Sequence, residues 1–398
     1  MNKNTKKNVI LLVSSTLLSI ILIYILFFFY IYLNLDRFIN QRFNSINSLE
    51  FHKKYSQILH HIRDTSSHKK YFQNLKNGEL NNLFTILSDY SSDKNNVLFQ
   101  GDSWAEQFLV NEGDYKLTIE HIKKISAKNN IGFINAGISS YSPTLMKLQF
   151  DVLEKDFNIK PDIVVIYIDQ TDIGDENCRY KHNRIFQEKK LIAIKEESFS
   201  GRPFDYTMKY KESEILLENN LKILKAFHMT NYKIFYGLKK MKVKNANKIN
   251  RILNYGWKNR TLPKCYWPEI ARYLFQSNEE ELNYFRNSIN FYLDSIEKKS
   301  YVQKIIVVTF PHLNHFQHLV NNNENIYKHN VSDIIDDLLA DRIKTDHLNF
   351  SNLIIEKNIK INKENFKKDD PASHLEPNFY STFFIKEITK RILKYIDK

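Results

Sequence analysis

The hydrophobic pattern begins with one long uncharged run, from Val9 to Leu33. About 20 apolar residues in a helix cross the hydrocarbon core of a bilayer, so this run predicts a transmembrane helix that contacts lipid through residues 9–33. A cleaved signal peptide has an apolar stretch of about 7–15 residues that ends in small residues. This run is longer and ends in Tyr30, Tyr32 and Leu33. With no comparable run downstream, the pattern predicts a single-pass membrane protein.

The charges on either side of this run bear on its orientation. Lys3, Lys6 and Lys7 precede it, and Arg37 and Arg42 follow it. Because positive charge favours the cytoplasmic side, we expect residues 1–8 to form a short cytoplasmic tail and the rest of the chain to lie outside the cytoplasm, in the periplasm or at the cell exterior. Residues 34–94 are polar and rich in helix formers, which predicts a helical stalk before a domain at 95–398.

Beyond the stalk, short apolar strands alternate with amphipathic helices. The predicted strands are 96–100, 131–135, 162–168 and 304–310, and the predicted helices are 106–110, 115–127, 143–157 and 379–396. This alternation is typical of an α/β domain with a doubly wound parallel sheet. It fades between about 179 and 300, where an aromatic, Lys-rich segment predicts a mostly helical insertion, including helices at 212–228 and 279–298.

Composition excludes several alternatives. The net charge of +13 suggests nucleic acid, but Lys, Asn, Ile, Phe and Tyr are enriched along the whole chain, and the densest basic stretch, 239–244, matches no nucleic-acid motif. We therefore expect no nucleic-acid partner, and interpret 239–244 as a solvated helix face or a contact with anionic membrane. Two cysteines exclude a disulfide framework. Cys178 and Cys265 form either one bridge in an oxidising compartment or two buried thiols.

Candidate chemistry follows the strands, because sites in open parallel sheets form beyond the carboxyl ends of the strands. Gly101-Asp102-Ser103-Trp104 follows the first strand and leads into a helix, where N–H groups favour a developing anion. A loop with Gly137 follows the second strand, and Asp169-Gln170-Thr171-Asp172 follows the third. Near the C-terminus, His374 follows Asp369-Asp370 in a loop before the last helix. Taken alone, the Ser103 and His374 segments are more often an ordinary helix cap and a solvated loop, and the Gly137 segment is equally compatible with an ordinary loop.

Together, these segments resemble the block pattern of the SGNH/GDSL hydrolase superfamily over about 95–173 and from Asp369 to the C-terminus. The resemblance implies a three-layer α/β/α, flavodoxin-like fold that hydrolyses or transfers O-linked acyl groups. It implies Ser103 as nucleophile, His374 as base and Asp370 as triad acid. Ser103 and Gly137 would supply oxyanion-hole N–H groups. Thr171 stands where the family has an oxyanion-binding Asn, so Thr171 or Gln170 would replace that donor. Asp370 lies four residues before His374, where the family has three.

The tether and the resemblance together predict an enzyme of the cell envelope. We expect a serine esterase or O-acyltransferase that acts on acyl esters of envelope glycans, as in alginate-acetylase-like proteins, beside membrane proteins of polysaccharide biosynthesis. No cofactor is expected. The alternatives are a catalytically inactive glycan-binding or assembly protein with the same fold, and a basic membrane-surface protein.

Further side chains near the same strand ends are candidates for substrate contacts or metal ligands. Trp104, Asp172 and His312 are candidate substrate contacts. Two sets suggest a metal only weakly, and we expect none: His312, His315 and His318, and Asp172, Asp175 and Glu176.

Overall fold

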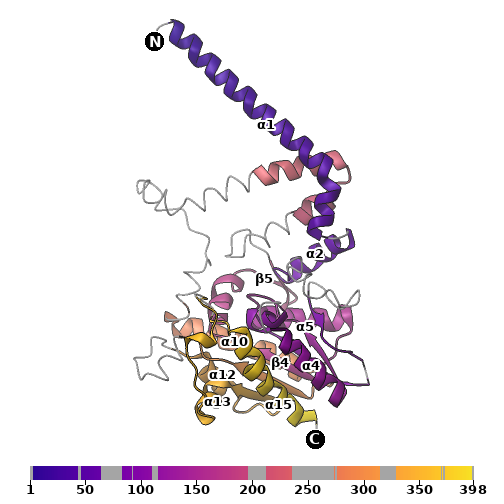
Figure 1. Cartoon of the computed structure of the whole chain (residues 1–398), viewed down its shortest axis with the longest axis vertical. Coiled ribbons are helices and arrows are strands. Elements are labelled where there is room, and N and C mark those ends of the chain that lie inside the picture. The colour runs from indigo at the N-terminus through magenta and orange to yellow at the C-terminus, as the bar shows by residue number, and fades with distance from the viewer. Residues whose placement is uncertain are drawn as a thin grey trace. The chain divides into compact units, whose positions relative to one another are not determined.

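The computed structural model describes residues 3–43, 46–63, 83–91, 93–109, 115–195, 212–234, 273, 276–313, 329–368, 370 and 373–396. The chain divides into two compact units (Figure 1). Unit 1 comprises Met1–Lys54 and Pro203–Leu262, and unit 2 comprises Tyr55–Arg202 and Pro263–Lys398. Cys265, His315, His318 and the basic stretch 239–244 lie outside the described residues.

Unit 1 is built on one long helix, α1 (Lys3–Phe43). Its segment Lys7–Ile39 has a mean hydropathy of 2.7 and is long and apolar enough to cross a membrane, which confirms the predicted N-terminal apolar helix. Residues 212–218 and 222–234 are also helical. Leu216, Ala226 and Met229 from these helices are buried with α1 side chains. Part of the insertion therefore belongs to the same unit as the apolar helix.

Unit 2 contains a six-stranded, mostly parallel sheet in a mixed α/β fold. Its strands are β1 (Thr85–Ile86), β2 (Asn95–Gln100), β3 (Ile131–Asn135), β4 (Ile163–Tyr167), β7 (Lys304–Thr309) and β8 (Thr345–Asn349). The spatial order is β1-β3-β2-β4-β7-β8, and only β1 is antiparallel to its neighbour. The parallel strands thus follow the 2-1-3-4-5 order of doubly wound sheets, which changes direction between β2 and β4.

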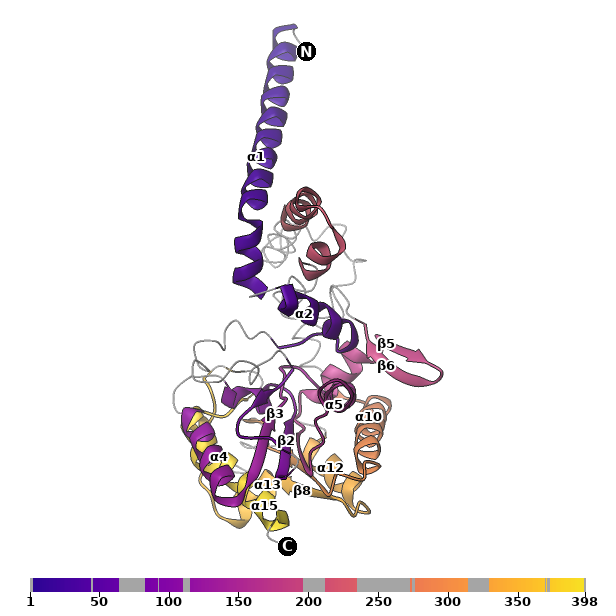
Figure 2. The same ribbon diagram turned by 90° about the vertical axis from the view of Figure 1, so that its right-hand side faces the viewer.

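Helices lie on both sides of this sheet (Figure 2). On one side are α4 (Tyr115–Asn129) and α15 (Ile385–Ile396), and on the other are α5 (Pro143–Phe157) and α10 (Glu279–Glu297). Alternate strand residues such as Phe99 and Val165 belong to the core cluster with Ile388 of α15. The strands are buried on both faces, which explains their continuous apolar sequences.

The remaining helices of unit 2 are short or sit at the sheet ends. They are α3 (Ser103–Glu106), η1 (Gln107–Leu109), α6 (Asp172–Gly174), η2 (Asp175–Tyr180), α12 (Val331–Leu339), α13 (Phe350–Glu356), η3 (Lys363–Asn365), α14 (Pro377–Phe379) and η4 (Tyr380–Phe384). The predicted closing helix 379–396 is thus α15 preceded by the wider turn of η4.

Two predicted boundaries differ from the structure. Unit 2 begins at Tyr55, not at 95, because Leu59, Ile62 and Arg63 are buried within it and β1 pairs with β3. The helix α2 (Ile46–Ile58) leads into this segment. The insertion also contains a β-hairpin of β5 (Arg184–Gln187) and β6 (Lys190–Ile194). The predicted stalk is therefore partly a component of the α/β unit.

Candidate active site

Ser103 lies at the point where the sheet order changes direction. It begins α3 directly after β2, and the neighbouring strand β4 leads to Asp169. Between β2 and α3, Gly101 has φ +155°, and a Cβ there would lie 2.7 Å from Cβ of Tyr167. Asp102 caps α3 by accepting a 2.8 Å hydrogen bond from the Trp104 N–H. Gly101 thus permits the close turn that places Ser103 at the carboxyl edge of the sheet.

His374 lies against Ser103. Its Nε2 is 2.6 Å from Ser103 Oγ, and its Nδ1 is 2.5 Å from Asp370 Oδ2. The side chains of His374 and Asp370 are each 17% exposed. The three residues predicted from the block pattern therefore form one continuous hydrogen-bonded relay.

A tight turn allows Asp370 to reach the histidine from four residues away. The Ser373 N–H donates to the Asp370 carbonyl at 3.1 Å, and Ser373 adopts a left-handed φ of 56°. The backbone N–H of His374 also donates to Asp370 Oδ2, at 3.2 Å. A bridge between Phe366 and Leu375 holds the base of the loop. The carboxylate therefore fixes the orientation of both the ring and the backbone of His374.

Trp104 is buried in the hydrophobic core next to this relay. Its side chain is only 3% exposed, and its ring lies 6.0 Å from the His374 ring and 5.4 Å from the Phe310 ring, centroid to centroid. This packing restricts the position of the imidazole. The predicted contact between Trp104 and substrate has no exposed ring face to support it.

The loop after β3 packs closely against α3. A Cβ on Gly137 would lie 2.6 Å from both the carbonyl carbon of Ala105 and the backbone N of Glu106. Only glycine fits this approach without a shift of the backbone. The Gly137 N–H, predicted to bind an oxyanion, donates instead to Asn135 Oδ1 at 2.8 Å. Gly137 therefore sets the position of the loop, and its N–H already has an acceptor.

The two side chains predicted to complete the oxyanion hole also have partners. The Thr171 hydroxyl donates to Asp169 Oδ1 at 2.7 Å. The Gln170 amide donates to the His329 carbonyl at 2.8 Å and accepts from the Val331 N–H at 3.1 Å. Gln170 thus ties the end of β4 to the start of α12. The Thr171 hydroxyl has one proton and would have to exchange its hydrogen bond before it could donate to a substrate oxygen.

A cluster of buried carboxyl groups lies beside the serine. Asp102, Asp169 and Asp172 are buried and offer oxygens within 4.8 Å of one another. Burial, followed by repulsion from Asp169, raises the pKa of Asp102 and of Asp172 well above the ordinary value for a carboxyl. Asp102 Oδ2 is 3.2 Å from Ser103 Oγ. These carboxyls therefore hold their protons to a higher pH than exposed carboxyls do.

Asp175 extends this acidic region. Burial raises the pKa of Asp175 to about 7, although Arg179 opposes the shift from 3.0 Å. The oxygens of Asp102, Asp169 and Asp172 are of the type and spacing that a divalent cation takes. Three of these oxygens already accept hydrogen bonds from backbone N–H groups: Asp102 Oδ1 from Trp104, Asp169 Oδ1 from Thr171, and Asp172 Oδ2 from Asp169.

The other two predicted substrate contacts are also buried. Asp172 belongs to the carboxyl cluster, and His312 is buried near Asp169, whose pKa is raised by burial while hydrogen bonds from Thr171 and the nearby His374 and His312 oppose the shift. His312 thus lies at the candidate site, on the loop after β7, as its position after a strand predicted. Neither side chain presents a broad exposed surface for a glycan.

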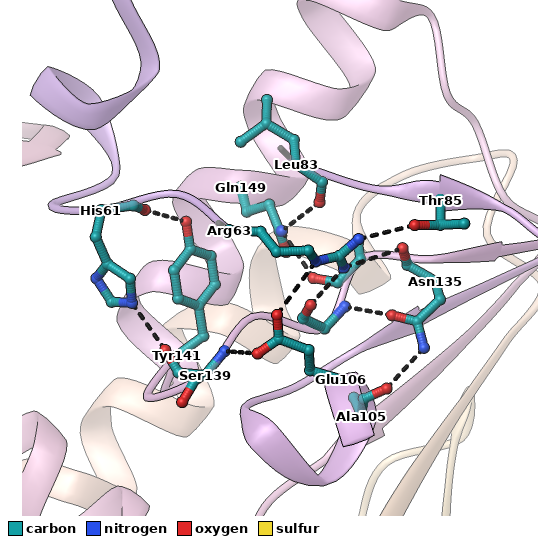
Figure 3. Close-up of polar contacts among 12 residues, drawn as sticks. His61, Arg63, Leu83, Thr85, Ala105, Glu106, Asn135, Ser139, Tyr141 and Gln149 are labelled. Carbon is teal, nitrogen blue, oxygen red and sulfur yellow. Dashed lines mark hydrogen bonds and ion pairs between the residues drawn. The ribbon is translucent and has the colours of Figure 1, made fainter. Parts of the chain in front are cut away.

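Sequence reasoning missed a buried ion pair that holds the Gly137 loop (Figure 3). Arg63 is fully buried, and its Nε is 3.4 Å from Glu106 Oε1. The Arg63 guanidinium also donates to Thr85 Oγ1 at 2.8 Å and to the Gly137 carbonyl. Glu106 in turn accepts from the Ser139 N–H at 2.8 Å. Arg63 and Glu106 therefore fasten both ends of the loop to α3, the helix of Ser103.

The residues next to Arg63 strengthen this attachment. His61 Nε2 lies 2.7 Å from the Ser139 carbonyl, and the Tyr141 hydroxyl donates to the His61 carbonyl at 2.7 Å (Figure 3). No local sequence pattern marks the segment as part of the site, because its partners come from distant elements.

Comparison with known proteins identifies no relative of this chain, so the site is interpreted from its geometry. The sequence matches no family model, and no curated protein matches it. The SGNH/GDSL resemblance therefore depends on the motifs and on where the folded chain brings them.

Proposed function

We propose that this protein is a membrane-tethered serine esterase or O-acyltransferase that acts on acyl esters of cell-envelope glycans. The observation that supports the proposal most is the relay in which Ser103 Oγ lies 2.6 Å from His374 Nε2 and His374 Nδ1 lies 2.5 Å from Asp370. A nucleophile in contact with a base that a third group orients is the signature of covalent acyl transfer. The relay stands at the strand ends between β2 and β4, where open parallel sheets bind ligands.

The reaction follows from these contacts. His374 Nε2 takes the proton from Ser103 Oγ as the oxygen attacks the ester carbonyl, and Asp370 stabilises the resulting imidazolium. The backbone N–H of Ser103, in the first turn of α3, is the donor best placed for the oxyanion. His374 then returns its proton to the departing alcohol, which leaves an acyl group on Ser103. Water or a sugar hydroxyl, activated by His374 in the same way, releases the acyl group.

The SGNH/GDSL assignment belongs to this proposal. Its supports are the 2-1-3-4-5 strand order, helices on both sides of the sheet, and the placement of Ser103 and His374 at one edge. The family pattern implies the three-layer α/β/α arrangement and a preference for O-linked acyl groups, of which acetyl is the smallest.

The proposed location outside the cytoplasm has two supports. One is α1, with three lysines before its apolar segment. The other is Cys178, which is disulfide-bonded and thus suits an oxidising compartment. A tether of this kind would hold the site beside glycans at the membrane surface.

A second candidate function is an SGNH-like glycan-binding or assembly protein without activity. The observation that favours it is the engagement of the Gly137 N–H, the Thr171 hydroxyl and the Gln170 amide within the protein. Loss of one oxyanion donor costs about 10²–10³ in rate. This candidate requires all three donors to stay engaged when an ester is present.

A fluorophosphonate probe separates the two candidates. The full chain in detergent micelles should be labelled at Ser103 and should hydrolyse an aryl acetate, and Ser103→Ala should lose both. Ser295→Ala, on α10, is the matched control and should keep both. A parent chain that is neither labelled nor active, while its circular dichroism shows a folded protein, would favour the inactive candidate.

A further inference from the structure

The helix at 222–234 in unit 1 has two unlike faces. Ala226 and Met229 are fully buried and belong to the core cluster that contains Ile31 and Leu35 of α1. Thr230 is buried on the same side. One face of this helix therefore packs on the helix that carries the apolar segment.

A second face, beside the packed one, is apolar and exposed. Ile223 is 55% exposed and Phe227 is 45% exposed, and Ile234 and Leu224 are also exposed. At about 100° per residue, positions 223, 227 and 234 fall within about 40° of one another around the helix axis. They form a single stripe, which we call the apolar stripe of 222–234. Such a stripe usually marks an interaction surface.

The stripe is continuous with the end of the membrane-crossing segment. The Tyr24 hydroxyl of α1 donates to Asn231 Oδ1 at 3.0 Å, and Asn231 lies on the same side of its helix as Phe227. About 20 residues from Val9 reach the far end of the hydrocarbon core near Phe28. Phe27, Phe28 and Tyr32 of α1 pack against the cluster shared with 222–234. Tyrosine and tryptophan side chains concentrate at the membrane–water interface, and Tyr32 belongs to this set, so helix 222–234 packs on α1 at that level.

The charges on this helix suit a lipid surface. Residues 222–234 contain three lysines and no acidic residue. Lys222 pairs with Asp36 at 3.0 Å, and Lys233 pairs with Glu212 and lies 4.7 Å from the Phe38 ring centroid. Lys225 is half-buried beside the packed face. The lysines thus lie away from the apolar stripe, as in interfacial helices that place an apolar face among acyl chains and cationic groups near headgroups.

We propose that helix 222–234 lies in the membrane interface and inserts its apolar stripe among the lipids, as a second attachment beside α1. The occupant of the stripe is the phospholipid bilayer itself, because the stripe adjoins the apolar segment of α1 at the level of the aromatic side chains. This inference depends on α1 as the membrane span and is independent of the ester chemistry.

Tryptophan placed on the stripe tests the proposal. The full-length Phe227→Trp protein would be reconstituted, one copy per nanodisc, in phospholipids brominated near the carbonyl end of the acyl chains. The three native tryptophans are accounted for by subtracting the parent protein measured identically. We expect the added tryptophan to emit at short wavelength and to lose about half or more of its emission to bromine, because interfacial helices bury their apolar face about 5–10 Å deep.

Ile343→Trp is the matched control, since Ile343 in unit 2 is the most exposed of the large apolar residues described. Its added emission should be red-shifted and unaffected by bromine. Emission from Phe227→Trp that is red-shifted and unquenched would overturn the proposal, because the stripe would then face water. Blue-shifted emission without quenching would overturn it too, because a protein surface would then cover the stripe. Both substitutions are at exposed positions, and circular dichroism would verify that each protein is folded.

Discussion

His374 Nε2 lies 2.6 Å from Ser103 Oγ, although 271 positions separate the two residues in the chain. One stands at the end of the first parallel strand and the other in the loop before the last helix. The contact depends on the turn that brings Asp370 to the far side of the imidazole, so the carboxylate sets the ring nitrogen that faces the serine.

Asp370→Asn should lower kcat/KM for an aryl acetate by about 10²–10⁴-fold, because an amide favours the wrong histidine tautomer and cannot stabilise imidazolium. Ser103 labelling by a fluorophosphonate should slow in parallel. Asp341→Asn, at an exposed position after α12, is the control and should leave both rates unchanged. If Asp370→Asn retains the parent rate, Asp370 is not the third member of the relay.

Removal of the Arg63 charge should destabilise unit 2. Arg63→Met leaves Glu106 buried without its cation, which typically costs about 3–5 kcal/mol. Arg63→Met/Glu106→Gln should recover part of this loss, because no uncompensated charge remains and the glutamine oxygen can still accept from the Ser139 N–H. Denaturant unfolding of the full chain in micelles, followed by circular dichroism, measures both changes.

The control for this pair is a surface arginine. Arg286→Met on α10 removes a 3.5 Å contact with the exposed Glu279 and an exposed 3.0 Å hydrogen bond to Asn283, and should change the free energy of unfolding by less than about 1 kcal/mol. Equal effects of Arg63→Met and Arg286→Met would contradict a structural role for the buried pair.

Gly137→Ala tests the close packing of the loop on α3. The new Cβ would meet backbone atoms of Ala105 and Glu106 at 2.6 Å, so the loop must move away from α3. We expect a loss of about 1–3 kcal/mol in stability from overpacking. We also expect a fall of about 10²-fold in kcat/KM, as is typical when reacting groups are displaced by about 1 Å. An unchanged rate would show that this loop does not set the catalytic geometry.

Much of the sheet could be predicted because its central strands are buried on both faces. β3 and α5 have the predicted bounds, β2 and β7 differ from theirs by one residue at one end, and β4 differs by one residue at each end. β8 could not be predicted, because Thr-Asp-His-Leu-Asn has neither an apolar run nor a clear alternation. It forms by pairing with β7 at the edge of the sheet. In the β5–β6 hairpin, β5 likewise has no buried residue.

The candidate site was predictable in its residues and not in its hydrogen bonds. The position of Ser103, Gly137 and His374 after strands or before a helix indicated that they meet at one edge. No sequence pattern could indicate that Asn135 takes the Gly137 N–H or that Asp169 takes the Thr171 hydroxyl. Arg63 falls in the predicted stalk, because its burial arises only when Glu106 and the Gly137 loop come together.

The buried Asp175 should make stability depend on pH in the direction opposite to that of an ordinary paired carboxylate. Its pKa is raised from 3.8 to about 7 by burial, so the folded protein holds a proton that the unfolded chain has released. The resulting stabilisation is fully present below about pH 4 and is lost as the pH rises to about 7. At 1.36 kcal/mol per pKa unit, this group alone accounts for a decrease of up to about 4 kcal/mol.

Thermal unfolding of the full chain in micelles between pH 4 and 8 measures this dependence. The midpoint temperature should fall with pH in the parent, and Asp175→Asn should reduce the slope because an amide does not titrate. The slope of midpoint temperature against pH is compared between the two proteins. The absolute midpoint is not compared, because the substitution also removes the 3.0 Å ion pair between Asp175 and Arg179. The Asp175→Asn protein should retain part of the fall in midpoint temperature with pH, because the pKa values of Asp102 and Asp172 are also raised. Asp341→Asn should leave the slope unchanged, and an identical slope in Asp175→Asn would exclude Asp175 as a titrating group in this range.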